Sequence, residues 1–183
     1  MSWWKQKLSD IFGLDPRSLA VFRIGVGIIL LVDLAVRATD LSAMYAGDGI
    51  LSIERSVKWA GDWGWSLHWL SGESWFQGLL FVFATTFAIA LLLGFHTRLA
   101  MIASWVLLVS LHTRNPLMLN GGDGMLRVLM FWGMFLPLGA VWSVDALRRR
   151  RVRIAGNERP FKPVTSVAGA CFIFQLCLVY WFA

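Results

Sequence analysis

The 183-residue sequence is poor in charge and in cysteine. Only 15% of its residues are charged, whereas 57% are hydrophobic and 11 are tryptophan. A soluble domain of this size would expose more polar surface, so the composition predicts a membrane protein. The two cysteines, Cys171 and Cys177, are six residues apart in an apolar segment and would project to different faces of a helix. This spacing disfavours a disulfide or a redox pair and favours two small hydrophobic side chains buried in lipid.

The common motifs of metal, phosphate and hydrolase sites are also missing. Three scattered histidines show no HxxxH or HxxE spacing, so no metal site is predicted. There is no phosphate-binding glycine loop after a strand, no GxSxG and no cleavable signal peptide. Most of the excess positive charge lies at residues 148–153, beside an apolar run. Such a block sets topology and contacts anionic lipid more often than it binds nucleic acid, so no nucleic-acid partner is expected.

Long apolar runs dominate what is present. About 20 apolar residues cross a bilayer, and the pattern predicts an all-α, polytopic membrane helical bundle in one domain. Residues 1–14 combine aromatic residues with lysines, as in a short helix that lies in the headgroup layer. About five spans are expected, at residues 18–38, 75–95, 99–111, 125–144, with a kink at Pro137, and 164–183.

The charges between these spans predict the orientation. Basic residues precede the first span, lie between the second and third, and form the block between the fourth and fifth. Positive loops remain in the cytoplasm, so we expect a multi-pass inner (plasma) membrane protein with a cytoplasmic N-terminus. The tryptophan-rich segment 39–74 and the polar segment 112–124, which we call the elbow, then lie outside.

The elbow allows two interpretations. In the structural one, Asp123 is the N-cap of the fourth span, Arg127 is its salt-bridge partner four residues on, and His112 and Arg114 are interfacial anchors. In the functional one, the elbow forms a water-accessible pocket whose cationic surplus suits an anionic group, with His112 moving protons near neutral pH. Its walls would be Arg37, His112, Arg114, Asn115, Asp123 and Arg127.

Charged and amide side chains within the spans also need an explanation. Asp33 and Arg37 are four residues apart in the first span, and a buried charge pair on a membrane helix indicates a functional site. Arg23, about a turn and a half into the same span, is expected to reach back to the cytoplasmic headgroups. Gln175 is interpreted as a hydrogen-bonding contact between helices rather than a ligand contact.

Several short segments together resemble the HTTM (horizontally transferred transmembrane) family, which includes the vitamin K-dependent γ-glutamyl carboxylases. Each segment is weak alone, but they occur in the family's order over nearly the whole chain. They are residues 15–23 (DPRSLAVFR), 31–37 (LVDLAVR), 93–98 (LGFHTR), 114–116 (RNP), 120–123 (NGGD) and 142–147 (WSVDAL).

The resemblance implies a site on the outer face, where the carboxylases oxidise a reduced naphthoquinone (vitamin K hydroquinone) and carboxylate a peptide glutamate. The elbow would then belong to the quinone and substrate region. The candidate catalytic residues are His112 and Asp123. The candidate quinone- or substrate-binding residues are Asp33, Arg37, Arg114, Asn115, Asn120, Arg127, Gln175 and Tyr180.

The chain departs from the carboxylases at two places. It has Gly122 and Asp123 where they carry an Asn-His pair, and it stops just short of the position of their catalytic lysine, after a similar segment at 174–183. Two hypotheses follow. The chain is the front part of a quinone-dependent oxidase or carboxylase-like enzyme, or it is a non-enzymatic membrane partner that docks a secreted peptide or a second membrane subunit on its tryptophan-rich loop.

Overall fold

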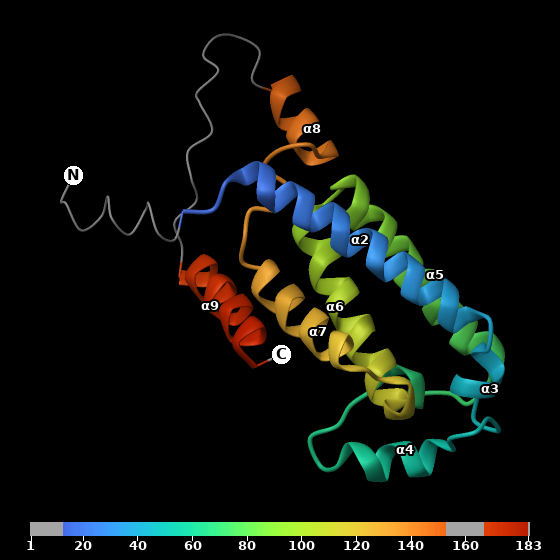
Figure 1. Ribbon diagram of the computed structural model, residues 1–183. Helices are drawn as coiled ribbons and strands as arrows, with labels where there is room; N and C mark the ends of the chain where they lie inside the picture. The colour runs from blue at the N-terminus through green and yellow to red at the C-terminus, as the bar shows by residue number, and fades with distance from the viewer. Residues whose placement is uncertain (1–12, 153–166, 183) are drawn as a thin grey trace.

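A computed structural model describes residues 13–152 and 167–182, so the interfacial helix expected at 1–14 lies almost entirely outside the described residues. The described part is built from helices joined by loops, as predicted (Figure 1). In chain order they are α2 (Pro16–Ala38), α3 (Leu41–Tyr45), α4 (Ile53–Ala60), η1 (Leu67–Trp69), α5 (Ser74–Leu93), α6 (Thr97–Arg114), η2 (Pro116–Met118), α7 (Gly121–Gly133), α8 (Val144–Val152) and α9 (Val167–Phe182).

Helices α2 and α5 form the longest pair and lie side by side in opposite directions (Figure 1). Helix α2 is capped by Asp15, because Asp15 Oδ1 accepts a hydrogen bond from the Arg17 amide at 2.7 Å and Pro16 occupies the first turn. The pair packs closely at Gly27, where an added Cβ would lie 3.0 Å from the Leu92 Cα. Helix α6 then runs back along α5, and α7 packs on α6 and α9.

Only α2 and α5 are long and apolar enough to cross a membrane among the described residues. The prediction of five spans is therefore not met. Helix α6 is longer than the expected 99–111 but carries polar residues at both ends, and α9 has 16 described residues. The expected fourth span, 125–144, is the clearest error, because α7 ends at Gly133 and Pro137 follows in a series of turns rather than kinking a helix.

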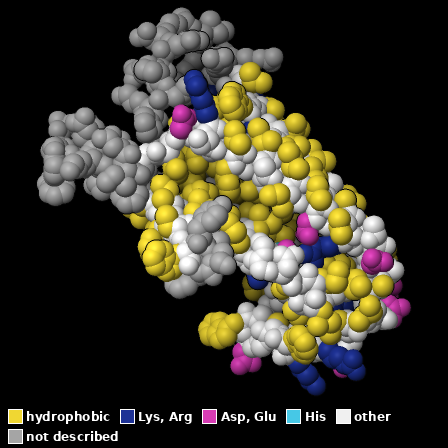
Figure 2. All heavy atoms as spheres, in the orientation of Figure 1, with side chains coloured by type: hydrophobic (Ala, Val, Ile, Leu, Met, Phe, Trp, Pro, Cys, Tyr) yellow, Lys and Arg dark blue, Asp and Glu magenta, His cyan; other side chains and the backbone are white. Residues whose placement is uncertain are grey.

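One end of the bundle holds α3, α4, η1, η2 and the start of α7, so the segment 39–74 and the elbow do lie together (Figure 1). We call this the elbow end. Hydrophobic side chains follow the exposed length of α2 and α5, and charged side chains gather toward the two ends, mostly at the elbow end (Figure 2). The core between the helices is aliphatic and includes Leu30, Leu91, Met101 and Met130.

The opposite end is fixed by Arg23, which is fully buried. Its Nη1 donates to the carbonyls of Leu91 and Leu92 at 3.1 Å, and its Nη2 donates to the Trp142 carbonyl at 2.6 Å. The guanidinium thus neutralises the free carbonyls at the C-terminus of α5, where the helix dipole favours a cation. The expected reach of Arg23 to the headgroups is wrong.

A carboxylate also stabilises this end of the bundle. Asp145, at the start of α8, accepts hydrogen bonds from the His96 amide and from the amide and hydroxyl of Thr97, at 2.7–3.0 Å. Burial alone would raise the pKa of Asp145, but these hydrogen bonds outweigh burial and hold the pKa below its usual value. Arg23 and Asp145 therefore clamp the α5–α6 turn from both sides, one on each helix terminus.

Candidate functional site

Arg37 is the centre of a buried charge network at the elbow end. Its Nε donates to both carboxylate oxygens of Asp33 at 2.8 Å, as the spacing of four residues predicts. Its Nη1 donates to the Tyr45 hydroxyl at 3.2 Å, and its Nη2 lies 3.4 Å from Asp123 Oδ1. The pair on α2 thus does reach the level of the elbow. Two carboxylates surround the guanidinium of Arg37. Arg37 therefore does not add the net positive charge that was expected of the pocket.

Asp123 belongs to this network and also to the cap of α7. The N-cap is Asn120, whose Oδ1 accepts from the amides of Gly122 and Asp123 at 2.8 and 3.3 Å, while Asp123 Oδ2 accepts from the Asn120 amide at 2.8 Å. This reciprocal capping box corrects the expected N-cap at Asp123. The second oxygen of Asp123 faces Arg37 rather than Arg127, so the expected Asp123–Arg127 salt bridge is not formed.

Arg114 and Asn115, both buried, fasten the end of α6 to α3. The Nε of Arg114 donates to the Tyr45 carbonyl at 3.2 Å and its Nη2 to the Ala46 carbonyl at 2.8 Å. The Asn115 amide donates to the Met44 carbonyl at 3.0 Å. These contacts satisfy free carbonyls at the C-terminus of α3. The two side chains therefore position the elbow and do not line its cavity.

His112 is the buried side chain at the elbow without such contacts. It is 0% exposed, and neither ring nitrogen makes a hydrogen bond to another described residue. Its Nε2 lies 3.7 Å from Asp123 Oδ1, just beyond hydrogen-bond reach. Nearly all buried polar groups are hydrogen-bonded in folded proteins. An imidazole that has none, next to a carboxylate, is suited to bind or deprotonate a ligand.

A cavity of about 270 Å³ opens beside His112. Trp59 and Trp63 form its aromatic wall, and Arg127 of α7 contributes a half-buried guanidinium that has no ion-pair partner in the described part of the chain. The remaining walls are Ala60, Gly64, Thr113, Pro116 and Leu119. Of the residues expected in the pocket, the structure places two, His112 and Arg127, in the cavity, with Arg37 and Asp123 behind His112.

Sequence reasoning missed the contribution of Trp59, Trp63 and Tyr45. The tryptophans were expected in an outer loop, but no local pattern shows that this loop folds over the elbow. Among the other candidates, Asn120 is exposed at the start of α7, Gln175 is half-buried in α9 without a hydrogen bond to another described residue, and the side chain of Tyr180 lies outside the described residues.

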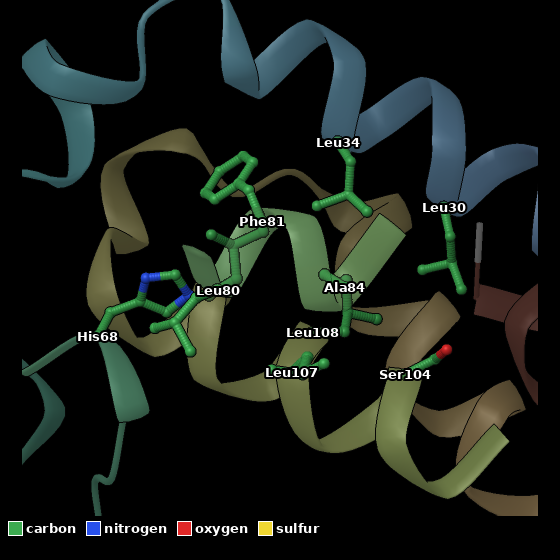
Figure 3. A pocket seen from close by; sticks show the side chains of 10 residues that line it. Leu30, Leu34, His68, Leu80, Phe81, Ala84, Ser104, Leu107 and Leu108 are labelled. Carbon is green, nitrogen blue, oxygen red and sulfur yellow. The ribbon is translucent and has the colours of Figure 1, made fainter. Parts of the chain in front are cut away.

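A second, narrower cavity lies between α2, α5 and α6 (Figure 3). Aliphatic side chains line it, together with His68 and the unpartnered hydroxyl of Ser104. The Gln77 amide nitrogen donates to the carbonyls of His68 and Ser71, so the Gln77 oxygen faces His68 Nδ1, and that nitrogen carries the ring proton. The other nitrogen, Nε2, points into the cavity (Figure 3). At about 20 Å³ the cavity has room for a water molecule only.

The larger cavity is therefore the candidate site. Among the described residues, no group of three His, Cys, Asp or Glu side chains could hold a metal ion. The comparisons with known proteins add no relative: no family model, no curated protein and no solved structure matches the chain. The function must therefore be argued from the geometry at His112.

Proposed function

We propose that the chain is a multi-pass inner-membrane protein of the HTTM type whose elbow binds a reduced naphthoquinone at the outer face. The proposal depends above all on His112, a buried imidazole that makes no hydrogen bond to a described residue, at the wall of a cavity of about 270 Å³, a volume that suits a small ring system. The membrane location is supported by α2 and α5. Only 39% and 22% of their most apolar stretches are buried, whereas the core helix of a soluble protein would hide most of its length.

The length of α2 fits the same proposal. Its 23 residues rise about 34 Å, enough for a hydrocarbon core of about 30 Å. Helix α8, in which the basic block begins, lies at the end of the bundle opposite the elbow end (Figure 1), so the positive-inside rule assigns the elbow to the outer side. Helix α6 then returns toward the outer side beside α5, with its polar ends at the two surfaces.

The cavity residues match the chemistry of a reduced naphthoquinone. When bound, such a molecule supplies two electrons and hydroxyl protons, with dioxygen as the electron acceptor. The planar faces of Trp59 and Trp63 suit a fused aromatic ring. The ring nitrogens of His112 make no hydrogen bond to a described residue but are covered by protein, so a ligand hydroxyl reaches one of them only after a side-chain shift. Asp123, 3.7 Å away, then stabilises the imidazolium that results. Arg127 lies in the cavity to stabilise negative charge left on an oxygen.

Binding can be measured on the full chain in lipid nanodiscs, without oxygen, by the quenching of tryptophan fluorescence with menadiol. We expect His112→Gln and Arg127→Gln each to weaken binding about tenfold, equivalent to about 1.4 kcal/mol. His96→Asn is the matched control. It replaces a histidine at the opposite end, with φ 43°, by a residue that tolerates this conformation, and binding should be unchanged.

Turnover is the second measurement. In air, the wild type should convert menadiol to its oxidised form faster than nanodiscs alone, and His112→Gln should remove most of the difference. Equal affinity for menadiol in the wild type and both cavity variants would reject this cavity as the quinol site. Binding without turnover would reduce the proposal to a quinol-binding protein.

A further inference from the structure

The outer surface of the elbow end carries two large aromatic side chains that the bundle does not cover. Trp59 is 65% exposed and Trp63 is 96% exposed. Trp59 lies on α4 and Trp63 lies in the loop 61–65 that follows it. The orientation of α4 is fixed, because Ser56 Oγ donates to the Arg114 carbonyl at 2.7 Å and Trp69 Nε1 donates to Ser56 Oγ at 2.9 Å. Because Ser56 faces the bundle, the rotation of α4 about its own axis is fixed. The tryptophans are therefore held at the surface and do not fold into the core.

The position of α4 is that of a helix at a membrane surface. It lies across the end of the bundle where α6 ends and α7 begins, crosswise to the long helices (Figure 1). Trp75, at the start of the apolar helix α5, is 69% exposed at the same end. Tryptophan is enriched where membrane spans meet the headgroup layer, because the ring is apolar and its N–H remains hydrogen-bonded. The three tryptophans thus mark one boundary of the lipid-exposed surface of α5.

The charges around the two tryptophans balance. Glu54, Arg55, Lys58 and Asp62 are exposed, two of each sign. Glu54 and Lys58 are four residues apart on the side of α4 that is turned away from Ser56, so that side suits water. An attraction to anionic lipid needs a surplus of basic residues, and none is present here. Contact with lipid would therefore depend on aromatic area rather than on charge.

We propose that α4 and the loop 61–65 bind the outer surface of the bilayer, with Trp59 and Trp63 in the headgroup layer. Because both rings also wall the cavity beside His112, the cavity mouth opens at the lipid surface. A molecule dissolved in the outer leaflet then reaches His112 without crossing bulk water. The inference rests on the proposed membrane location but not on the nature of the ligand, so a failure of menadiol binding leaves it intact.

The test uses the full chain in nanodiscs of phosphatidylcholine brominated either near the headgroups or near the chain ends. Bromine quenches tryptophan at short range. The quenching attributable to Trp59 and Trp63 is the difference between the wild type and the variant Trp59→Phe/Trp63→Phe. We expect this difference to be at least twofold larger with the shallow bromines. Trp105→Phe is the control, since Trp105 lies between α6 and α7 and donates to the Arg127 carbonyl.

Acrylamide in the water phase gives the complementary result. Quenching of the same two rings by acrylamide should be severalfold weaker in nanodiscs than for free tryptophan, and neither measurement should change when a third of the lipid is replaced by phosphatidylglycerol. If the two rings are quenched by acrylamide as free tryptophan is, and not by either brominated lipid, the proposal is overturned. The surface then faces water and is open to a protein partner. A strong dependence on phosphatidylglycerol would overturn the aromatic basis of the contact.

Discussion

The side chains of His68 and His112 are almost equally buried but differently bonded. Gln77 holds Nδ1 of His68 and thereby fixes its tautomer, whereas neither nitrogen of His112 is hydrogen-bonded within the described part of the chain. A fixed imidazole stabilises the fold in its neutral form. An unbonded one keeps its hydrogen-bonding capacity for a ligand, although its nitrogens are covered by protein, which is why we assign proton transfer to His112 alone.

The pH dependence of stability should report His68 together with His112, because burial lowers the pKa of His112 to about 4 as well. Burial lowers the pKa of His68 to about 4, from 6.5. The unfolded chain then binds a proton that the folded chain does not, so the stabilisation is complete above pH 6.5 and is lost as the pH falls from 6.5 toward 4. The loss is on the order of 3 kcal/mol. Unfolding in nanodiscs across this range should show a smaller decrease for His68→Gln than for the wild type. An equal decrease in the free energy of unfolding for the two proteins over this pH range would contradict the prediction.

Residue identity also explains which polar side chains were interpreted correctly from sequence. The Asp33–Arg37 pair could be predicted because both partners lie on one helix, four residues apart. The roles of Arg23, Arg114 and Asn115 could not be predicted, because each side chain binds backbone carbonyls that are about 70 residues away in the sequence. Backbone acceptors leave no trace in side-chain spacing.

At the scale of elements, the turn between α5 and α6 is the most constrained part of the chain. Gly94 adopts φ 70° at the C-terminus of α5. A Cβ at this position would collide with the Arg23 guanidinium and with the Ser143 side chain. The glycine is thus required both by backbone conformation and by the clamp that crosses it.

Two alanine substitutions, one at the C-cap of α5 and one within the helix, should therefore act in opposite directions. Gly94→Ala should destabilise the protein by at least about 2 kcal/mol, because it combines a strained φ with the loss of hydrogen bonds to a charged group. Gly78→Ala is the matched control. A Cβ there meets nothing within 4 Å, so the substitution should stabilise the helix by about 0.5–1 kcal/mol. The measurement is the free energy of unfolding of both variants in the same nanodiscs, and equal effects would refute the clamp.

Helix α7 shows why element boundaries were harder to predict than element type. Its apolar residues continue past Gly133 through Val141, so hydrophobicity alone extends the helix to the next charged residue. The chain instead turns at 134–143, where Pro137 cannot continue a helix and Leu136, Leu138 and Val141 are buried in turns. The length of the apolar run correctly predicted that these residues are buried, but it did not predict that they form turns.

For the whole molecule, the exposed apolar surface is the feature that decides its surroundings. Along α2 and α5, large aliphatic side chains such as Val32, Val36 and Val82 are about 60% exposed. The all-helical class and the gathering of polar groups at one end were predictable from composition and spacing. The number of helices long enough to cross a membrane was not predictable, because short apolar helices that pack on other helices have the same composition as membrane spans.

A single lysine substitution in α5 tests whether this apolar surface faces hydrocarbon or water. Val82, near the middle of α5, is 62% exposed, and Val82→Lys should cost about 2.5–3.5 kcal/mol if the side chain faces hydrocarbon. Val57→Lys in α4, at an exposed position outside the long helices, should cost less than about 0.5 kcal/mol. The comparison is made by unfolding in bilayers. Costs that do not differ would mean that α5 faces water.

The contacts of Arg23 also have a consequence for the order of events during biosynthesis. The guanidinium leaves the ribosome well before Leu91 and Leu92, and some 120 residues before Trp142, whose carbonyls it needs. Helix α2 would therefore enter a bilayer with an unsatisfied cation, which the insertion machinery or water must accommodate until the acceptors arrive. In a bilayer, α2 would thus become stable only when the turn before α8 has been made, and the described chain up to that point would integrate as one unit rather than helix by helix.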